Sequence, residues 1–324
     1  SEKRRPQDGR IKTRNTQGQE VELRLSTMPT AFGEKLVMRI FDPMVLLRNF
    51  RALGFTEADE KQWQEMIGNP HGIILVTGPT GSGKTTTLYS TLKLLAQPDV
   101  NVCTVEDPIE LVDPAFNQMQ VQPGIELTFA AGVRTLMRQD PDIIMIGEIR
   151  DTETADMAVQ AALTGHLVLS TLHTNDAPSS ISRLLDLGVP PFLIQSTLLG
   201  VIAQRLVRTL CPHCRKETPL RDGEWDMLVA PWKGAPKPAR VYTAGGCLEC
   251  RNTGYRGRIG LYEMLAFSAG LKQLIKDEFD VDALRQEAIR AGMKPLRLRG
   301  ALKVAEGVTT MEEVLRVVPP PSHG

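Results

Sequence analysis

The sequence predicts an α/β protein whose core is a parallel sheet with a phosphate-binding loop at one edge. Two short apolar stretches, residues 73–76 and 143–146, have the composition of strands buried on both faces. Segments with a helical pattern alternate with such strands, as a parallel sheet with crossover helices requires. A glycine-rich stretch, residues 78–85, directly follows the first strand and precedes a helical segment. This order of strand, loop and helix is typical of nucleotide-binding α/β proteins.

The glycine-rich loop matches the pattern G-x-x-x-x-G-K-[ST] at every fixed position. Its glycines allow a tight turn in which backbone N–H groups point inward at phosphate oxygens. Lys84 supplies positive charge to the β- and γ-phosphates, and the Thr85 hydroxyl is a candidate ligand of Mg²⁺. The helix that begins at Lys84 adds its positive dipole end, so we predict that the chain binds a nucleoside triphosphate. The predicted nucleotide-binding residues are Gly78, Pro79, Thr80, Gly81, Ser82, Gly83, Lys84, Thr85 and Thr86.

The composition is that of an ordinary globular protein. The chain has 324 residues, of which 42% are hydrophobic and 23% are charged, enough for a large core. Its 38 Lys and Arg residues balance its 38 Asp and Glu residues, which argues against a general nucleic-acid binder. No apolar run approaches the roughly eighteen residues of a membrane span, and no signal peptide opens the sequence. The five cysteines are therefore expected to be reduced, in a cytosolic protein.

Residues 1–42 are predicted to be part of a small α+β domain. Two stretches of alternating pattern, residues 21–25 and 35–40, predict strands with one buried face. Two such strands make a poor independent domain, so we interpret this region as the C-terminal remnant of a larger one. Residues 43–55 are interpreted as a linker.

Residues 56–210 are predicted to form the α/β core. A capping-box pattern at Thr56 begins its first helix, and Thr128 begins a later one. The region from 184 to 210 is predicted to be mostly helical. The predicted strands are residues 73–76, 102–105, 143–146 and 167–172, and the predicted helices are residues 56–68, 84–95, 128–138 and 152–165.

Three polar side chains directly follow strands of this core: Glu106, Glu148 and His173. The carboxyl ends of parallel strands meet at one edge of a sheet, which is where ligands bind. A carboxylate there can polarise the attacking water, so either Glu106 or Glu148 is a candidate general base. His173 is a candidate sensor or stabiliser of the γ-phosphate. The alternative, a solvent-facing or helix-capping role, is less expected for three groups at one edge.

Two C-x-x-C pairs predict a zinc site within residues 211–260, a region otherwise irregular and rich in Gly and Pro. Each pair places two thiolates on one tight turn, and two such turns complete a closed, structural Zn²⁺ site. Two disulfides are disfavoured by a reducing compartment, and a redox pair would leave the second pair unexplained. Cys103 lies in an apolar strand and is predicted to be core. The predicted zinc ligands are Cys211, Cys214, Cys247 and Cys250.

The remaining chain, residues 261–318, is predicted to be a helical region. Thr309 and Glu312 are interpreted as a capping box for its last helix. Residues 319–324 are predicted to be a disordered tail.

Several motifs of this chain resemble those of secretion ATPases. Residues 104–110 resemble the Asp box, residues 136–151 an atypical Walker B motif, and residues 164–173 the His box. Residues 204–211 and the tetracysteine region resemble the secretion and pilus-extension branch, whereas retraction ATPases generally lack that region. From residue 6 to about residue 318, the chain is similar to the ATPases of type II secretion and type IV pilus assembly.

The resemblance implies a RecA-like P-loop NTPase core that hydrolyses ATP with Mg²⁺, and a tetracysteine module that binds Zn²⁺. It implies catalytic roles for Glu106, Glu148 and His173, and it implies that Arg10 and Arg24 reach the nucleotide phosphates from the N-terminal region. It also implies a homohexamer in the cytoplasm, peripheral at the inner membrane and in contact with platform proteins, with no nucleic-acid partner. The family's first N-terminal domain and half of its second are missing here, so most platform contacts would involve absent regions.

Within that family, residues 162–165 and 198–204 look closer to type II secretion than to pilus extension. The expected function is therefore Mg-dependent ATP hydrolysis that powers pseudopilus assembly in type II protein secretion. The first alternative is a type IV pilus extension ATPase. Two alternatives belong to other classes: a conjugation or DNA-translocation motor, and a nucleotide-binding interaction module without hydrolysis. Neutral charge and the tetracysteine region count against the former, and Lys84 with the three strand-end groups counts against the latter.

Overall fold

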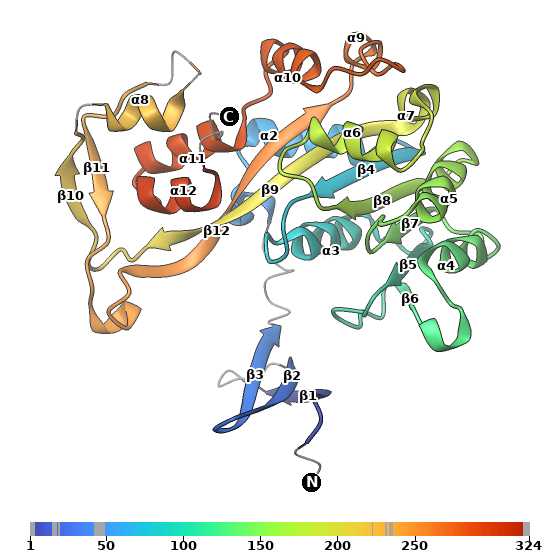
Figure 1. Ribbon diagram of the computed structural model, residues 1–324, viewed down its shortest axis with the longest axis horizontal. Coiled ribbons are helices and arrows are strands. Elements are labelled where there is room, and N and C mark those ends of the chain that lie inside the picture. Colours follow the sequence, from blue (N-terminus) through green and yellow to red (C-terminus); the bar gives the residue numbers. More distant parts are fainter. Residues whose placement is uncertain are drawn as a thin grey trace.

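The computed structural model describes residues 4–14, 18, 20–41, 49–221, 223–230, 232 and 236–319. A seven-stranded sheet runs through its centre (Figure 1). Its strands, in spatial order, are β12 (Tyr255–Ala266), β9 (Leu198–Leu210), β4 (Gly72–Thr77), β8 (Leu167–Leu172), β7 (Ile143–Ile146), β5 (Val102–Glu106) and β6 (Asn117–Gln120). All neighbours are parallel except β12, which is antiparallel to β9. The predicted α/β class with a parallel sheet is confirmed.

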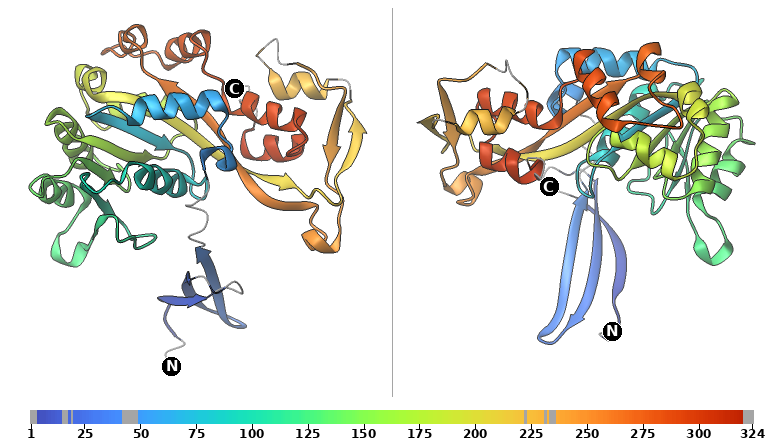
Figure 2. Two further views of the ribbon diagram at one scale, coloured as in Figure 1. Left: turned by 180° about the vertical axis from the view of Figure 1, so that it is seen from behind. Right: turned by 45° about the horizontal axis from the view of Figure 1, so that its top comes forward.

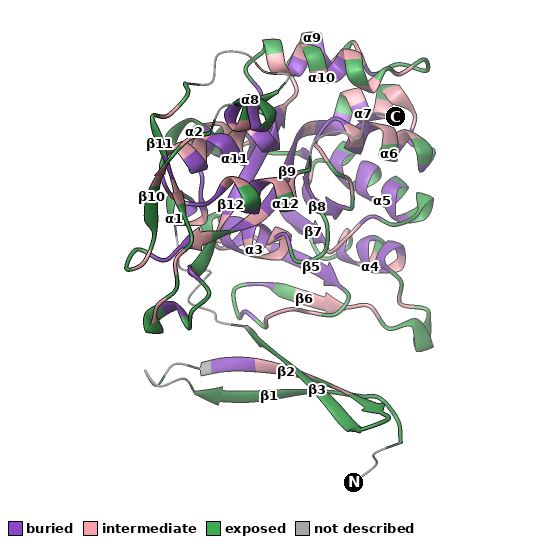
Figure 3. Cartoon of the chain, turned by 60° about the vertical axis from the view of Figure 1, so that its left-hand side comes forward, coloured by how far each residue is buried: buried purple, intermediate pink, exposed green. Residues whose placement is uncertain are grey.

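Helices cover both faces of this sheet, so the central strands β4, β8, β7 and β5 are buried, whereas the edge strand β6 is partly exposed (Figure 3). Side chains of β4 alternate between two apolar clusters: Ile74 and Val76 face one, and Ile73 and Leu75 face the other. Cys103, predicted to be core, is buried in β5. Packed with Ile74 and Val76 are α1 (Phe50–Leu53), α2 (Glu57–Ile67) and α3 (Lys84–Leu95). On the other face lie α4 (Phe129–Leu136), α5 (Thr152–Leu163), α6 (Ser179–Asp186) and α7 (Pro191–Thr197).

The N-terminal residues form a separate three-stranded antiparallel sheet (Figures 1 and 2). Its strands are β1 (Gln7–Arg14), β2 (Glu20–Thr30) and β3 (Gly33–Phe41). The two predicted strands are confirmed as parts of β2 and β3, while β1 was not predicted. Most of the predicted linker, residues 42–48, lies outside the described residues, and α1 occupies its described end.

The prediction that residues 184–210 are mostly helical is wrong beyond α7. From Leu198 the chain is a thirteen-residue strand, β9, that lies between β4 and β12. Residues 198–203 are almost continuously apolar, a pattern that fits a buried strand as well as a buried helix. Pairing along both edges satisfies the backbone polar groups of β9, and this tertiary context decides in favour of the strand.

Residues 211–260, predicted to be irregular, contain ordered elements. They are β10 (Lys216–Pro219), α8 (Glu224–Val229), β11 (Arg240–Thr243) and the 3₁₀ turn η3 (Leu248–Cys250). The strand β12 begins at Tyr255 and continues into the region predicted to be helical. The helices of that region are α9 (Ala269–Lys272), α10 (Val281–Arg290), α11 (Leu296–Ala305) and α12 (Met311–Val317). A further 3₁₀ turn, η2 (Pro123–Ile125), precedes α4.

Helix starts follow the predicted caps with one exception. Thr56 and Asp59 form the predicted capping box of α2, and Thr128 caps α4. The predicted box at Thr309 and Glu312 is wrong by one residue, because Thr310 caps α12. Thr309 instead donates a hydrogen bond from its hydroxyl to the carbonyl of Arg208 in β9. Along the described ranges, no helix has both the length and the apolar content to cross a membrane. Most of the predicted disordered tail, residues 320–324, lies outside the described residues.

Candidate nucleotide site and metal centre

The glycine-rich loop connects the end of β4 to the start of α3, as the sequence predicted. Gly78, Gly81 and Gly83 all have positive φ, at 151°, 78° and 89°, which non-glycine residues rarely adopt. A Cβ atom on Gly78 would lie 2.6 Å from the carbonyl oxygen of Gln204 in β9. The backbone conformation therefore favours glycine at all three positions, and the close approach of β9 also excludes a side chain at Gly78 and Gly83.

The side chain of Lys84 folds back onto the glycine-rich loop. Its Nζ donates hydrogen bonds to the carbonyl oxygens of Gly78 at 2.6 Å and Pro79 at 3.0 Å. Burial lowers the pKa of Lys84 to about 8; the negative charge of Glu148 acts to raise it, and the positive charge of Arg205 lowers it further. The ammonium group is therefore held against the loop backbone by two carbonyl oxygens. The side-chain hydroxyl of the neighbouring Thr85 makes no hydrogen bond with the described residues. It is therefore free to coordinate a metal ion.

Glu148 and His173 are brought together at the carboxyl ends of β7 and β8. His173 Nε2 lies 3.3 Å from one carboxylate oxygen of Glu148, and Arg150 pairs with the other. Burial acts to raise the pKa of Glu148, but the hydrogen bond and charge of Arg150, and then His173, outweigh it, so the pKa is lowered. A second carboxylate, Asp107, lies 4.0 Å from Arg150. Glu148 is thus an ionised carboxylate at the edge of the sheet where the γ-phosphate of a bound nucleotide would lie.

Glu106, the third strand-end group, lies in a different environment. It is buried, and its carboxylate accepts hydrogen bonds from the hydroxyls of Tyr89 and Thr104 and from the amide of Gln118. Burial, together with the negative charge of Glu106, raises the pKa of Tyr89. The ring of Phe116 stacks on that of Tyr89 at 6.0 Å between centroids. Both oxygens of Glu106 are therefore occupied by protein donors.

Arg10 and Arg24 approach the core at the loop after β5. Both donate hydrogen bonds to the carbonyl oxygen of Ile109, Arg10 at 2.8 Å. Arg24 also pairs with Glu110 at 2.8 Å, and Arg10 lies 3.4 Å from Glu22 of its own sheet. The structure thus brings the two arginines together beside the loop that carries Glu106 and Asp107. Among the described residues, neither arginine contacts the glycine-rich loop.

Sequence reasoning missed the polar side chains of β9 that support the glycine-rich loop. Gln204 is buried; its amide donates to the carbonyl of Ser82 at 2.8 Å and accepts from the hydroxyl of Thr87 at 2.8 Å. Arg205 donates to the carbonyls of Gln204 and Asn175. These residues lie in the segment that was predicted to be helical, so the pairing of β9 with β4 gave no signal in the sequence.

A basic cavity of about 380 Å³ opens beside the glycine-rich loop. Glu313 of α12 is buried at its edge and pairs with Arg208 at 2.8 Å and Arg316 at 2.7 Å. Burial acts to raise the pKa of Glu313, but hydrogen bonds from Arg316 and Arg208 outweigh it and hold the pKa at about 2. One acidic group therefore offsets part of the positive charge. The charged residues that line the cavity are Arg205, Arg208, Arg258, Glu313 and Arg316.

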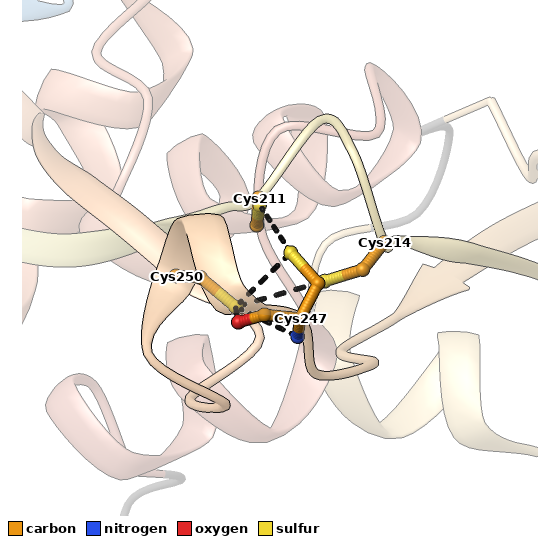
Figure 4. Close-up of side chains that lie close together, drawn as sticks. All are labelled: Cys211, Cys214, Cys247 and Cys250. Atoms are coloured by element: carbon orange, nitrogen blue, oxygen red, sulfur yellow. Dashed lines mark hydrogen bonds between the residues drawn. The ribbon is translucent and has the colours of Figure 1, made fainter.

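The four predicted zinc ligands converge on one point at the far end of β9 (Figure 4). All four Sγ atoms lie within 4.8 Å of one another. The distances from Cys211 to Cys247 and from Cys214 to Cys250 are both 3.8 Å, and that from Cys247 to Cys250 is 3.7 Å. Zinc bound to four thiolates at about 2.3 Å requires sulfur–sulfur distances of about 3.8 Å. Backbone N–H groups of Cys247 and Gly254 also donate to the Cys250 sulfur, so the donor set fits Zn²⁺.

Comparison with known proteins identifies the family of the chain. The family described as Type II/IV secretion system protein matches residues 1–316. The type IV pilus assembly ATPase TfpB of Acinetobacter baylyi is 64% identical over 319 residues, which cover 98% of this chain and 54% of that protein. Type II secretion system protein E of Pseudomonas aeruginosa is 50% identical over 317 residues, covering 98% of this chain and 62% of that protein. The chain thus spans roughly half to three fifths of the length of these relatives.

Solved structures share the fold. The pilus retraction motor PilT with bound ADP superposes with a TM-score of 0.68 at 26% identity, over 99% of this chain and 80% of that one. The ATPase DotB of Legionella pneumophila superposes with a TM-score of 0.69 at 23% identity, over 97% of this chain and 77% of that one. The predicted fold and family are confirmed together: this chain belongs to the type II/IV secretion system protein family.

Proposed function

We propose that this chain is the motor part of a Mg-dependent ATPase. The observation that carries the proposal is the position of Lys84, in the glycine-rich loop, and of Glu148 with His173 at the ends of the neighbouring strands. Mg²⁺, when bound, would neutralise phosphate charge. The Thr85 hydroxyl would hold it, and loop N–H groups and Lys84 would bind the β- and γ-phosphates.

In this proposal Glu148 is the general base. Its carboxylate is ionised and near Lys84, so it can accept a proton from water placed in line with the γ-phosphate. His173 bonds Glu148 and would report the presence of the γ-phosphate. Glu106 is assigned a positioning role, because it is buried and held by three protein donors, whereas the Glu148 side chain is 15% exposed at the strand ends. Arg10 and Arg24 would stabilise transition-state charge after the N-terminal sheet moves from the Ile109 loop toward a nucleotide.

We propose assembly of a type IV pilus as the biological role. The relative at 64% identity is named a type IV pilus assembly ATPase, whereas those named type II secretion proteins are 50% identical or less. The comparisons thus favour the alternative over the expected role in pseudopilus assembly. Type II secretion remains the second candidate, because protein E of Pseudomonas aeruginosa is similar over the same range. A homohexamer in the cytoplasm, bound to an inner-membrane platform, would be the working form.

A test of the role is deletion of the gene in the organism that carries it. Loss of surface pili with normal protein secretion supports the pilus role. Normal pili with exoproteins retained in the periplasm would assign the chain to type II secretion instead. A purified protein whose turnover is stimulated by DNA and falls steeply with salt would point to a DNA motor.

The ATPase proposal is tested with the Lys84→Ala variant. Removal of the ammonium group leaves the β- and γ-phosphate charge without its partner, so tight ATP binding or turnover should be lost. Phosphate release and nucleotide affinity are measured beside the wild type and Lys61→Ala, which changes an exposed lysine of α2. Lys61→Ala should behave as the wild type. Wild-type turnover in Lys84→Ala would remove the glycine-rich loop from the mechanism.

A further inference from the structure

We propose that Gln204 is a positioning residue that fixes the orientation of the Ser82–Gly83 peptide in the glycine-rich loop. The inference rests on the proposed function, since it assigns a role in nucleotide binding. Gln204 is 1% exposed and lies in β9, more than a hundred residues after the loop in the sequence. Among the described residues, its side chain forms hydrogen bonds with groups of the loop and of α3 alone.

The direction of the Gln204 amide is determined by its two partners. The Ser82 carbonyl can only accept a hydrogen bond, so the Gln204 NH₂ group must face it, at 2.8 Å. The Gln204 oxygen then faces the Thr87 hydroxyl, which donates to it at 2.8 Å. A reversed amide would set two carbonyl oxygens against each other. The first turn of α3 therefore holds Gln204 in the orientation that binds the loop.

Pinning the Ser82 carbonyl also directs the next N–H group. The C=O and N–H of one planar trans peptide point in opposite directions. Because the Ser82 carbonyl is directed at Gln204, the Gly83 N–H is directed away from β9. Backbone N–H groups of such a loop are the donors that bind nucleotide phosphates. Gln204 thus sets whether this peptide presents a donor or an acceptor to the phosphates.

This control is needed because Gly83 has several accessible conformations. Its φ is 89°, and glycine populates this and other regions of φ about equally readily. Local backbone preference alone therefore does not fix the orientation of the Ser82–Gly83 peptide. A Cβ on Gly83 would lie 2.8 Å from Gln204 Nε2, which shows how closely the amide approaches the loop. At the other end of the loop, Gly78 packs on the Gln204 carbonyl. One residue of β9 therefore contacts both ends of the loop.

The Gln204→Met variant tests this role. It keeps the side-chain length but removes the donor to Ser82, so the peptide is free to flip and to turn its carbonyl toward the phosphates. Affinity for ADP should fall about tenfold or more, the loss of one charge-assisted hydrogen bond. Gln204→Glu keeps the acceptor for Thr87 but places a carboxylate against the Ser82 carbonyl, and it should lose at least as much. Titration calorimetry of the full chain with ADP gives the affinity, and the thermal unfolding midpoint without nucleotide gives the stability.

The matched control is Thr91→Val, one turn further along α3. The Thr91 hydroxyl is equally buried, accepts from Trp63 at 3.1 Å and donates to the Thr87 carbonyl at 2.7 Å, but has no contact with the loop. Thr91→Val should lower the unfolding midpoint while keeping ADP affinity within about twofold of the wild type. If Gln204→Met fails to fold, Thr87→Val is used in its place. In that variant the Gln204 amide keeps its hydrogen bond to the Ser82 carbonyl but loses the one from the Thr87 hydroxyl, so an intermediate loss of ADP affinity is expected.

Two results would overturn the inference. One is a Gln204 variant that binds ADP as the wild type does. The other is an equal loss of affinity in Thr91→Val, which would mean that general destabilisation explains the effect. A wild-type chain that binds neither ADP nor ATP would overturn the proposed function as well, so the two failures are distinguishable.

Discussion

At the scale of single residues, Lys84 gives the nucleotide site a pH dependence. Burial lowers the pKa of its ammonium group to about 8 from an ordinary 10.5. A bound phosphate would favour the charged form and raise the pKa again. Near pH 8.5, the Lys84 side chain is therefore partly neutral in the free site and charged in the occupied site. Nucleotide binding then takes up a proton. Affinity for ADP should fall as pH rises above about 8.

Calorimetry in two buffers of different ionisation enthalpy measures this proton uptake. Lys84→Arg is the control, because a guanidinium stays charged over the whole range. Its proton uptake near pH 8.5 should vanish. Equal uptake in Lys84→Arg and in the wild type would assign the titrating group to another residue.

Glu148 and Glu106 should differ when each is changed to glutamine. Glu148→Gln removes the proposed base without changing the phosphate contacts, so nucleotide should still bind while turnover falls about a hundredfold or more. Glu106→Gln instead disturbs the buried bonds of Tyr89, Thr104 and Gln118, so the unfolding midpoint should fall together with turnover. ATPase rates, nucleotide affinity and thermal unfolding of both variants separate the two roles. Normal hydrolysis by Glu148→Gln would show that its assigned role is wrong.

The residue pattern predicted part of this site. Glu148 and His173 each follow a buried strand, and adjacent strands of one parallel sheet place them 3.3 Å apart. Glu106 also lies at the end of a strand, but it is enclosed by Tyr89 of α3 and Gln118 of β6. Its position at a strand end gives no information about these two elements. Long-range side-chain contacts of this kind leave no local pattern.

At the scale of elements, the N-terminal sheet carries its arginines to the core on β1 and β2. Arg10 and Arg24 are partners in the antiparallel register, so both project from one face of the sheet. Replacing either with alanine should lower the ATPase rate far more than nucleotide affinity, if they act on transition-state charge. Lys35→Ala, at an exposed position of β3, is the control and should change neither. Equal losses in rate and affinity would mean that the arginines bind ground-state phosphate.

The elements also show where sequence patterns fail. The strands β4, β7 and β8 were predicted because each is a short apolar run next to a recognisable turn or cap. The strand β9 was not, because residues 198–203 lack any period that separates helix from strand. Its identity depends on β12, a partner more than forty residues later, which pairs with it from Gly200 to Leu210. Local pattern cannot encode such a pairing, so Gln204 was missed with the strand that carries it.

At the scale of the whole molecule, β9 connects the two sites. Gln204 contacts the glycine-rich loop, and Cys211, the first metal ligand, directly follows the end of the same strand. Between them, Arg208 pairs with Glu313 of α12 and lies over the ring of Tyr255 at 4.1 Å. The nucleotide site therefore contacts the middle of β9, and the cysteine cluster begins directly after the end of the same strand. Because the two sites contact different parts of β9, mutations at one site should be able to leave the other unchanged.

The region between the cysteine pairs is better packed than its sequence indicated. The sequence shows few apolar residues there, yet Trp225, Leu228 and Val229 of α8 and Val241 of β11 are buried in the main core. The helix α8 packs on α11 (Figure 2). The four predicted zinc ligands lie outside this core cluster, and Leu248 of the second cysteine turn is 90% exposed. Metal is thus expected to stabilise the turns and the β10–β11 pair more than α8.

Removal of zinc should therefore loosen this region locally. Purified protein is expected to contain one zinc ion per chain, as the preformed set of four sulfurs indicates. Chelation, or Cys214→Ser, should admit protease cutting at the cysteine turns and at β10 and β11, while ADP affinity changes less than about twofold. Mass spectrometry of the fragments locates the cuts, and calorimetry measures ADP. Absence of zinc with four free thiols would contradict the metal assignment. A parallel loss of ADP affinity would show instead that β9 transmits the state of the metal site to the loop that Gln204 holds.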